Sequence, residues 1–190
     1  MSVIVALLIA GMALPTVGRA QEGVQGVPVT IQVAILFKVL SLDKNVARKG
    51  AEELKVCVVF DSRNAESKKS REEFEAAVGA GKKVAGLTIL LHSFDLASGK
   101  PLASYLRETN TGALYATSGL GAQAEKIAEA AREAQATATA GEAALVEQGL
   151  ATGVEAQDNK PRIVINLSAS KAQGADFSSE VLKLARITGK

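Results

Sequence analysis

The chain has 190 residues, of which 47% are hydrophobic and 22% charged, a composition typical of a single globular domain. Its 22 basic and 20 acidic residues leave a formal charge of +2, and only 4% of its residues are aromatic, so it offers neither the clustered positive charge nor the stacking side chains that nucleic-acid binding requires. One cysteine and one histidine exclude an intramolecular disulfide, a cysteine zinc cluster and any site that needs two imidazoles.

The first twenty residues have the pattern of a secretory signal peptide. Residues 3–14 are an unbroken run of apolar and small residues, and Pro15 and further small residues follow at offsets suited to cleavage after Ala20. The run is shorter than the roughly 18 to 20 residues that a membrane-spanning helix needs. We therefore expect residues 1–20 to be a signal peptide and residues 21–190 to be a single α/β domain. The mature protein is expected to be periplasmic and not to span the membrane.

The rest of the sequence alternates between helix and strand patterns. Residues 29–42 follow Pro28, which suits a first helical turn, and are apolar almost all round, so they predict a mostly buried helix, with a strand as the alternative. Short, continuous apolar runs rich in β-branched residues are typical of strands covered on both faces. Such runs are found at residues 54–60, 84–91 and 113–117.

Further helices are expected between these strands and at the C-terminus. Ser70 and Glu73 have the spacing of a capping box, which predicts a helix that begins there and is ended by Gly79 or Gly81. Residues 101–108 predict a short helix, and residues 122–136 an Ala-rich one. A final helix is expected to carry one apolar stripe, made of Phe177, Val181, Leu184 and Ala185.

The C-terminal region also contains a hairpin pattern. Residues 152–157 and 162–167 are strand-like runs on either side of the turn-forming cluster 158–161, which predicts a β-hairpin. Repeated strand-then-helix units followed by a hairpin indicate the α/β fold class. We expect a three-layer sandwich with a mostly parallel sheet and a C-terminal antiparallel hairpin.

The sequence contains few candidate catalytic groups. His92, Ser93 and Asp95 are the residue types of a hydrolase triad, but neighbours in sequence seldom point at one another, and no G-x-S-x-G motif is present. His92 is therefore expected to be a solvated loop histidine. Cys57 lies within a predicted central strand, which favours a buried small hydrophobe over a nucleophile. We predict no catalytic residue, no metal site and no cofactor.

A glycine-containing loop is the strongest candidate for ligand binding. Residues 119–124 match the G-x-G-x-x-A pattern of dinucleotide-binding loops, and Glu142 follows at the spacing of a ribose-binding acid, although the motif lies late in the chain. Without a cofactor, the same strand-to-helix loop can hold a carboxylate or phosphate on backbone N–H groups, or be a plain tight turn. The candidate ligand-binding residues are Thr117, Ser118, Gly119 and Gly121.

A series of residues in the C-terminal part has a recognisable order: a Gly-led strand, a charged turn, an Arg-led strand ending in Ile-Asn, a short Ala-rich turn of helix and a Ser-initiated helix. These features fall on Gly153, Arg162, Ile165, Asn166, Gly174, Ser178, Ser179, Leu182, Leu184, Ala185 and Ile187. With them, the run 149–187 resembles the C-terminal part of the YfiR/HmsC family of bacterial periplasmic regulatory proteins. The resemblance extends more loosely to residues 33–45 and 115–120.

The resemblance implies a regulator rather than an enzyme. The best-known members of the family hold an inner-membrane diguanylate cyclase inactive by binding its periplasmic domain, which lowers cyclic-di-GMP signalling and biofilm formation. Such members are α/β proteins that form homodimers. Some carry cysteine pairs that respond to redox conditions, a mechanism that Cys57 alone does not provide.

Two functional hypotheses follow. The first is a non-enzymatic periplasmic regulator that binds and restrains a membrane sensor or diguanylate cyclase. Its candidate partner-binding residues are apolar side chains of the first and last helices, namely Ile31, Ile35, Phe37, Phe177 and Leu182. The second is a periplasmic small-ligand-binding module or cryptic nucleotide-binding enzyme, whose pocket would lie at the carboxyl edge of the sheet, around Ser62 and the 117–121 loop.

Overall fold

The computed structural model describes residues 26–50 and 52–189. The predicted signal peptide, residues 1–20, lies outside the described residues. Within the described part of the chain, no helix combines the length and apolar character needed to cross a membrane.

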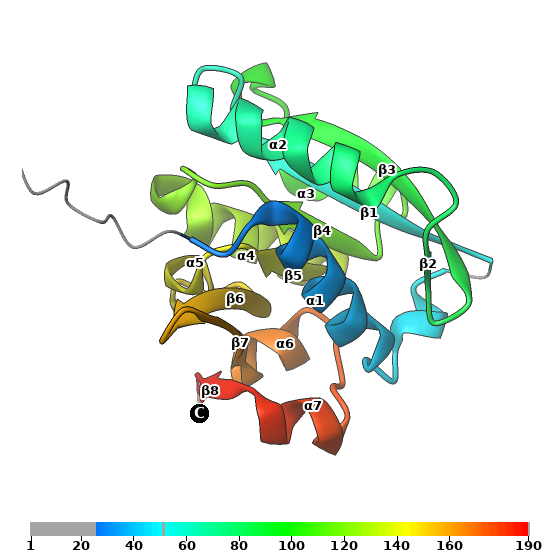
Figure 1. Cartoon of the computed structure of the whole chain (residues 1–190). Helices are drawn as coiled ribbons and strands as arrows, with labels where there is room; N and C mark the ends of the chain where they lie inside the picture. The colour runs from blue at the N-terminus through cyan, green and yellow to red at the C-terminus, as the bar shows by residue number, and fades with distance from the viewer. Residues whose placement is uncertain (1–25, 51, 190) are drawn as a thin grey trace, which may run out of the picture.

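One mixed sheet forms the centre of the domain and curls into a half-barrel (Figure 1). In the described residues its strand order is β2-β3-β1-β4-β5-β6-β7-β8. The strands from β3 to β6 run parallel, whereas β2 and β7 each pair antiparallel with a neighbour. The strands are β1 (Glu53–Phe60), β2 (Lys83–Val84), β3 (Leu87–Asp95), β4 (Ala113–Ala116), β5 (Thr137–Ala140), β6 (Thr152–Gln157), β7 (Lys160–Asn166) and β8 (Arg186–Thr188).

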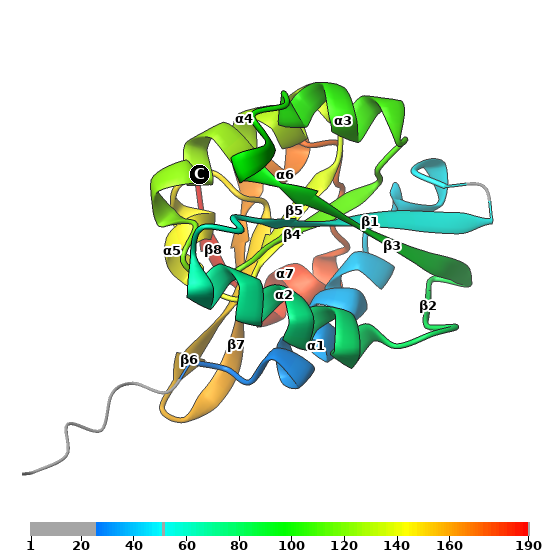
Figure 2. The same ribbon diagram turned by 90° about the horizontal axis from the view of Figure 1, so that it is seen from above.

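Helices cover both faces of this sheet, as the view from above shows (Figure 2). Helices α1 (Val29–Ser41) and α2 (Ala65–Val78) pack on one face, and α3 (Leu102–Glu108) and α4 (Ala124–Ala134) pack on the other. The shorter α5 (Ala143–Glu147), α6 (Leu167–Ala172) and α7 (Ser179–Leu184) lie around β6 and β7. Three-residue 3-10 turns lie at Val46–Arg48, Leu96–Ser98 and Gly121–Gln123. The predicted three-layer α/β architecture is confirmed.

The alternation of side chains along β1 shows how one strand serves two cores. Val56 and Val58 belong to the cluster under α1 and α2, whereas Cys57 and Val59 belong to the cluster under α3 and α4. Successive residues of a strand point to opposite faces, so a continuous apolar run satisfies both layers at once. This is why residues 54–60 could be identified as a central strand from sequence.

The predicted C-terminal hairpin is confirmed and has a specific turn. Strands β6 and β7 pair antiparallel from Thr152 opposite Ile165 to Gln157 opposite Lys160. The two residues between them, Asp158 and Asn159, have φ values of 50° and 57°. Positive φ at both positions is the requirement of the tight hairpin turn that matches the twist of the strands, and Asp and Asn tolerate it better than most residues.

Two local predictions in the N-terminal half were wrong. Helix α2 begins at Ala65, where the Asn64 side chain accepts hydrogen bonds from the N–H groups of Glu66 and Ser67, and not at the predicted capping box. Ser70 lies in the middle of α2 and is buried. The predicted strand 84–91 is two strands, because Ala85 and Gly86 both adopt positive φ and turn β2 back onto β3.

The last forty residues differ from the expected single final helix. Phe177 precedes α7 and Ala185 follows it in extended conformation, so neither is helical. The short Ala-rich helical turn of the C-terminal pattern is α6. Short elements that were not predicted are β5, α5 and β8, and each has between three and five residues, too few for a hydrophobic period to stand out.

Candidate functional site

The carboxyl ends of β1 and β4 mark the topological switch point, the position at which open α/β sheets bind ligands, and we call this position the crevice. Strand β1 leads into α2 on one face and β4 leads toward α4 on the other, so the two connections diverge at this point. The loops that border the crevice are residues 61–64 and 117–121. The structure thus places the predicted ligand-binding loop at the topological position that the sequence analysis expected.

Side chains of α2 close this crevice. The hydroxyl oxygens of Ser67 and Thr117 lie 2.6 Å apart, and both side chains are buried. The N–H of Ser118 donates to Ser70 Oγ at 3.2 Å, and the Asn64 amide donates to the carbonyl oxygen of Gly119 at 3.2 Å. Thr117 Oγ1, the Ser118 N–H and the Gly119 carbonyl therefore already have protein partners. A ligand on Thr117, Ser118 or Gly119 would have to displace them.

The conformation of the loop explains the glycine at its centre. Gly119 has a φ of +78°, and a Cβ there would lie 2.7 Å from the Asn64 side-chain nitrogen. Gly121 has ordinary φ and open space around it. Only the first glycine of the G-x-G pattern is thus required by the fold, and its requirement arises from the contact with α2.

Carboxylates beside the crevice stabilise its loops. Arg63 donates through Nε and Nη2 to the two oxygens of Asp61, at 3.0 and 2.8 Å, which lowers the pKa of Asp61 to about 2. Asp95 Oδ1 accepts from the N–H groups of Ser62 and Ala97 at 3.0 and 2.9 Å. Both carboxylates are therefore ionised hydrogen-bond acceptors for nearby donors, a structural role rather than that of a paired acid and base.

The predicted loop position of His92 was wrong, because β3 continues to Asp95 and includes it. His92 is half-buried, with Nδ1 3.0 Å from the Tyr105 hydroxyl and Nε2 3.0 Å from Thr111 Oγ1. Desolvation lowers the pKa of His92 below its usual value. Ser93 instead donates to Glu75 at 2.5 Å. His92, Ser93 and Asp95 thus bind different partners and do not form a triad.

Cys57 is completely buried between the two helical layers. Burial raises the pKa of its thiol to about 12. A thiol that stays protonated and inaccessible is neither a nucleophile nor a redox sensor, so the prediction of a buried hydrophobe is confirmed. Among residues 26–50 and 52–189, no group of three or more His, Cys, Asp or Glu side chains is placed to hold a metal ion.

The predicted partner-binding residues divide into exposed and buried positions. Ile31 is 42% exposed, and Ile35 and Leu182 are partly exposed. Phe37 packs edge-to-face on Phe74 with ring centroids 6.2 Å apart, and Phe177 is buried beside α1, so neither phenylalanine is exposed to a partner.

The exposed members continue into a larger apolar surface between α1, β7, β8 and α7. Ile35, Ile163, Leu182, Ala185 and Ile187 all pack against one cluster built on Val39, Ile165, Phe177 and Val181, and all remain partly accessible. Ile31 lies one helical turn before Ile35, on the same side of α1. We call these six partly exposed residues (Ile31, Ile35, Ile163, Leu182, Ala185 and Ile187) the α1–α7 surface.

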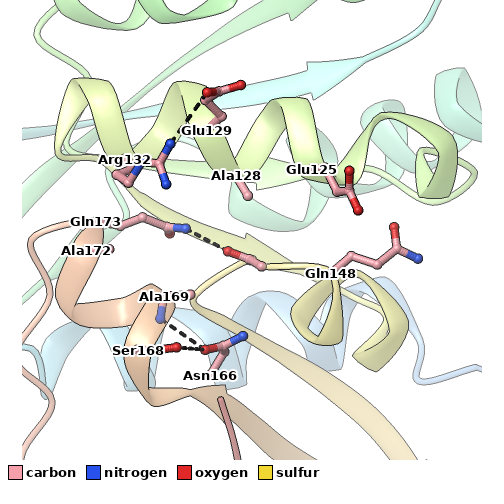
Figure 3. A pocket seen from close by; sticks show the side chains of 11 residues that line it. Glu125, Ala128, Glu129, Arg132, Gln148, Asn166, Ser168, Ala169, Ala172 and Gln173 are labelled. Atoms are coloured by element: carbon pink, nitrogen blue, oxygen red, sulfur yellow. Dashed lines mark hydrogen bonds and ion pairs between the residues drawn. The ribbon is translucent and has the colours of Figure 1, made fainter. Parts of the chain in front are cut away.

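A polar cavity of about 470 Å³ lies between α4, the residues that follow α5, and α6 (Figure 3). Glu125, Glu129 and Arg132 of α4 form one wall, and Gln148 and Ser168 line other sides. Arg132 lies 3.5 Å from Glu129, and both are largely exposed. The one cation among these three rim groups is therefore already paired with a carboxylate.

Two buried amides form the floor of this cavity, and sequence reasoning gave neither of them a role there. Gln173 accepts from the Ala138 N–H and donates to the Gly149 carbonyl, both at 2.9 Å. Asn166 accepts from the Ala169 N–H and donates to the Val146 carbonyl, both at 3.0 Å. Each amide joins segments far apart in sequence, which explains the presence of Asn166 in the C-terminal pattern as a structural requirement.

The sequence analysis also missed a buried ion pair. Asp43 Oδ2 lies 3.3 Å from Lys49 Nζ, with side chains 0% and 9% exposed. Lys49 Nζ also contacts Thr137 Oγ1. The carboxylate's other oxygen accepts from the N–H groups of Asn45 and Asp176 at 2.9 and 2.8 Å. Asp176 is 133 positions away along the chain, so no local pattern indicates this contact.

The fold is similar to that of several solved bacterial structures. The ABC domain in complex with L-Trp from Streptococcus pneumonia aligns with a TM-score of 0.58 and 16% identity, over 84% of this chain and 61% of that one. A conserved domain protein from Vibrio cholerae O1 biovar El Tor gives 0.59 and 16%, over 85% and 60%. A substrate binding protein with adhesive properties from Clostridium difficile, in its ligand-free, open structure, gives 0.54 and 12%, over 76% and 57%.

This chain spans about three fifths of the length of these structures. At such identities the likeness shows the fold alone. The fold and the sites together define an α/β domain with side chains of α2 packed on the loop at the carboxyl ends of β1 and β4, and with an apolar surface beside α1 and α7.

Comparison of the sequence with known protein families identifies the family of this chain. Residues 30–186 match the YfiR/HmsC-like family. The chain therefore belongs to this family, a family of periplasmic regulators that is not known for catalysis. A comparison with curated proteins found no match.

Proposed function

We propose that this protein is a non-enzymatic periplasmic regulator that binds and restrains a membrane signalling protein. Membership of the YfiR/HmsC-like family over residues 30–186 carries the proposal. The candidate partner is the periplasmic domain of an inner-membrane sensor or diguanylate cyclase, whose restraint would lower cyclic-di-GMP and biofilm formation. The mature protein would be residues 21–190, exported by the signal peptide 1–20.

The α1–α7 surface is the proposed docking site. Apolar side chains that stay partly exposed on a folded domain mark places where burial against a partner contributes binding free energy. Ile31 and Leu182 lie on different elements of this surface, and the buried Phe177 behind it is held by the apolar cluster. A rigid apolar patch is suited to bind a protein, because little side-chain freedom is lost on docking.

The test is to produce the protein together with the membrane cyclase encoded nearest to its gene and to measure cyclic-di-GMP. The unaltered protein should lower the nucleotide, and Ile31→Glu or Leu182→Glu should restore it, because a carboxylate on the patch must be desolvated when the partner binds. Leu96→Glu, a partly exposed residue near α3, is the matched control and should leave repression intact. Full repression by both surface variants would refute the docking site.

Localisation has its own test. Cell fractionation followed by mass spectrometry should find the protein in the periplasm, with Gln21 as its first residue. A protein that keeps residues 1–20 and stays in the cytoplasm would contradict the proposed role, because the partner domain lies across the membrane.

Small-ligand binding is a second candidate function, favoured by the fold likeness to the domain solved with L-Trp. The ligand would bind at Thr117, Ser118, Gly119 and Gly121 after α2 releases them. Thermal-shift measurements with amino acids, nucleotides and sugars should then raise the melting temperature. Ser118→Pro, which removes one loop N–H, should abolish the shift. Unchanged melting temperatures with all three ligand classes would contradict this candidate.

A further inference from the structure

The polar cavity beside α4 lies outside both the crevice and the α1–α7 surface. Its volume of about 470 Å³ falls within the range of about 300–1,000 Å³ that small-molecule sites occupy. Its walls come from three separate segments, namely α4, the residues that follow α5, and α6. Most of the residues that line it have charged or hydrogen-bonding side chains, so a ligand that fits this cavity has to be polar.

Opposite charges lie at the two ends of the α4 wall. Glu125 is in the first turn of α4 and Arg132 is in the last turn, and Figure 3 shows them at opposite ends of the cavity. Seven residues of α-helix rise about 10 Å, which is the separation of the two charged residues along the wall. Among the described residues, Glu125 has no partner within ion-pair distance. Its carboxylate is therefore free to bind a cationic group of a ligand.

The present partner of Arg132 holds it only weakly. Arg132 Nη2 lies 3.5 Å from Glu129 Oε1, at the limit of a hydrogen bond, and the two side chains are 59% and 62% exposed. An exposed ion pair of this kind contributes little free energy, because water solvates both groups well. The guanidinium group also has five N–H donors. Arg132 can therefore bind a ligand carboxylate without losing a strong contact.

Two buried amides provide donors along the floor of the cavity. Asn166 and Gln173 are 7% and 1% exposed. Each side-chain nitrogen has two hydrogens, and among the described residues each donates one hydrogen bond, to the Val146 and Gly149 carbonyls respectively. The second hydrogen of each amide is free for a carbonyl oxygen of a ligand. Because the other hydrogen bonds hold both amides in place, they need no reordering when a ligand binds.

The space between these polar groups is lined by small side chains. Ala128 points from α4 into the cavity, and Ala169 and Ala172 of α6 border it from the other side (Figure 3). Methyl groups leave room for the backbone of a ligand and can contact its short apolar side chains. The cavity thus has a cation-binding end, an anion-binding end and amide donors between them.

We propose that this cavity binds a short peptide of about three residues with free termini, lying along α4. The ammonium group of the peptide pairs with Glu125 and its carboxylate with Arg132. The carbonyl groups of the peptide accept hydrogen bonds from Asn166 and Gln173. An extended chain spans at most about 3.3–3.6 Å per residue, so three residues cover the helix rise of about 10 Å between the charges. This inference goes beyond the proposed regulatory function and does not depend on it.

Calorimetric titration of the protein with trialanine tests the site. Trialanine should bind at one site, more weakly as the salt concentration rises. N-acetyl-trialanine has no ammonium group and trialanine amide has no carboxylate. Each should bind at least about fivefold more weakly than trialanine, because each loses one charge-assisted hydrogen bond. No binding of trialanine at millimolar concentration would overturn the proposal, and so would equal affinities for all three peptides.

Two variants assign the ends of the peptide. Glu125→Gln should bind trialanine at least about fivefold more weakly and lose the preference for a free ammonium group, while it keeps the preference for a free carboxylate. Arg132→Gln should show the reverse pattern. Lys126→Gln is the matched control, because Lys126 is an exposed residue of α4 outside this cavity, and it should bind like the parent.

All three substituted side chains are exposed, so each variant should fold, which circular dichroism verifies. The blocked peptides test the same contacts in the parent protein and need no variant. Parent affinity for trialanine in both Glu125→Gln and Arg132→Gln would overturn the proposed site. A preference for free termini that stays unchanged in both variants would also overturn it.

Discussion

The buried pair of Asp43 and Lys49 makes a strong prediction about stability. Asp43 joins the end of α1 to the segment before α7, since it accepts hydrogen bonds from Asn45 and Asp176 and faces Lys49 at 3.3 Å. Asp43→Ala leaves the buried ammonium group without its carboxylate and leaves two N–H groups without an acceptor. Breaking a buried ion pair from one side costs about 3–5 kcal/mol of unfolding free energy.

That loss corresponds to a large fall in melting temperature. For a domain of this size, each kcal/mol shifts the melting temperature by about 2–4 °C, so Asp43→Ala should melt about 6–20 °C lower. Urea unfolding followed by circular dichroism measures the free energy directly. Lys44→Ala is the control, because Lys44 pairs with Asp176 at the surface, where both side chains are more than half exposed, and should cost less than about 1 kcal/mol.

The double variant Asp43→Asn with Lys49→Met tests the cause. It removes both charges and keeps an oxygen for the two N–H groups, so its stability should return to within about 1 kcal/mol of the parent. Burial lowers the pKa of Lys49, which is the sign of a costly buried charge. If Asp43→Ala unfolds within about 1 kcal/mol of the parent, the pair contributes no such stabilisation and the reasoning is refuted.

Three further predictions follow from single residues. Burial lowers the pKa of His92, so the unfolded chain binds the proton at a higher pH than the folded protein does. The free energy of unfolding should therefore fall as the pH drops from about 7.5 through the pKa of His92 in the folded protein. His92→Gln should reduce this pH dependence in urea titrations at several pH values. A slope unchanged in the variant would contradict this. Cys57, with its pKa near 12, should not react with a thiol reagent at pH 8 until the protein is unfolded, and rapid labelling of the native protein would contradict the burial. Gly119→Ala should lower stability by about 1–3 kcal/mol, because its φ is positive and Asn64 lies too close for a Cβ, whereas Gly121→Ala should change little; equal effects in thermal melts would contradict this account.

The predicted start of a helix was correct where the sequence offers one start signal, and wrong where two residues could each cap the same helix. Pro28 and a continuous apolar run correctly indicated α1, because both features act within a few residues. The capping box at Ser70 was wrong because Asn64 is an equally good cap six residues earlier, and the Ser70 side chain is instead buried against the β4 loop. A capping pattern indicates a possible helix start, and packing decides which one is used.

For the candidate sites, the position of a loop could be predicted from the sequence, but the contacts that other helices make with it could not. The position of the 117–121 loop at the sheet's carboxyl edge could be predicted from strand order alone. Its closure by Ser67 and Ser70 could not, because those hydroxyls lie on another helix. The mixture of exposed Ile31 and buried Phe37 in one apolar stretch was also beyond prediction, since it depends on which side of α1 faces α2.

The sequence by itself determined the fold class, the central strand, the hairpin and the resemblance to a regulator family. These depend on periodicity, turn residues and local order, which are properties of neighbouring residues. The tertiary structure alone decided that side chains of α2 pack on the 117–121 loop, that His92 and Asp95 belong to separate hydrogen-bond networks, and that Asp43 pairs with Lys49. These properties depend on contacts between residues far apart along the chain, where burial and the pairing of backbone groups are settled only when the layers pack.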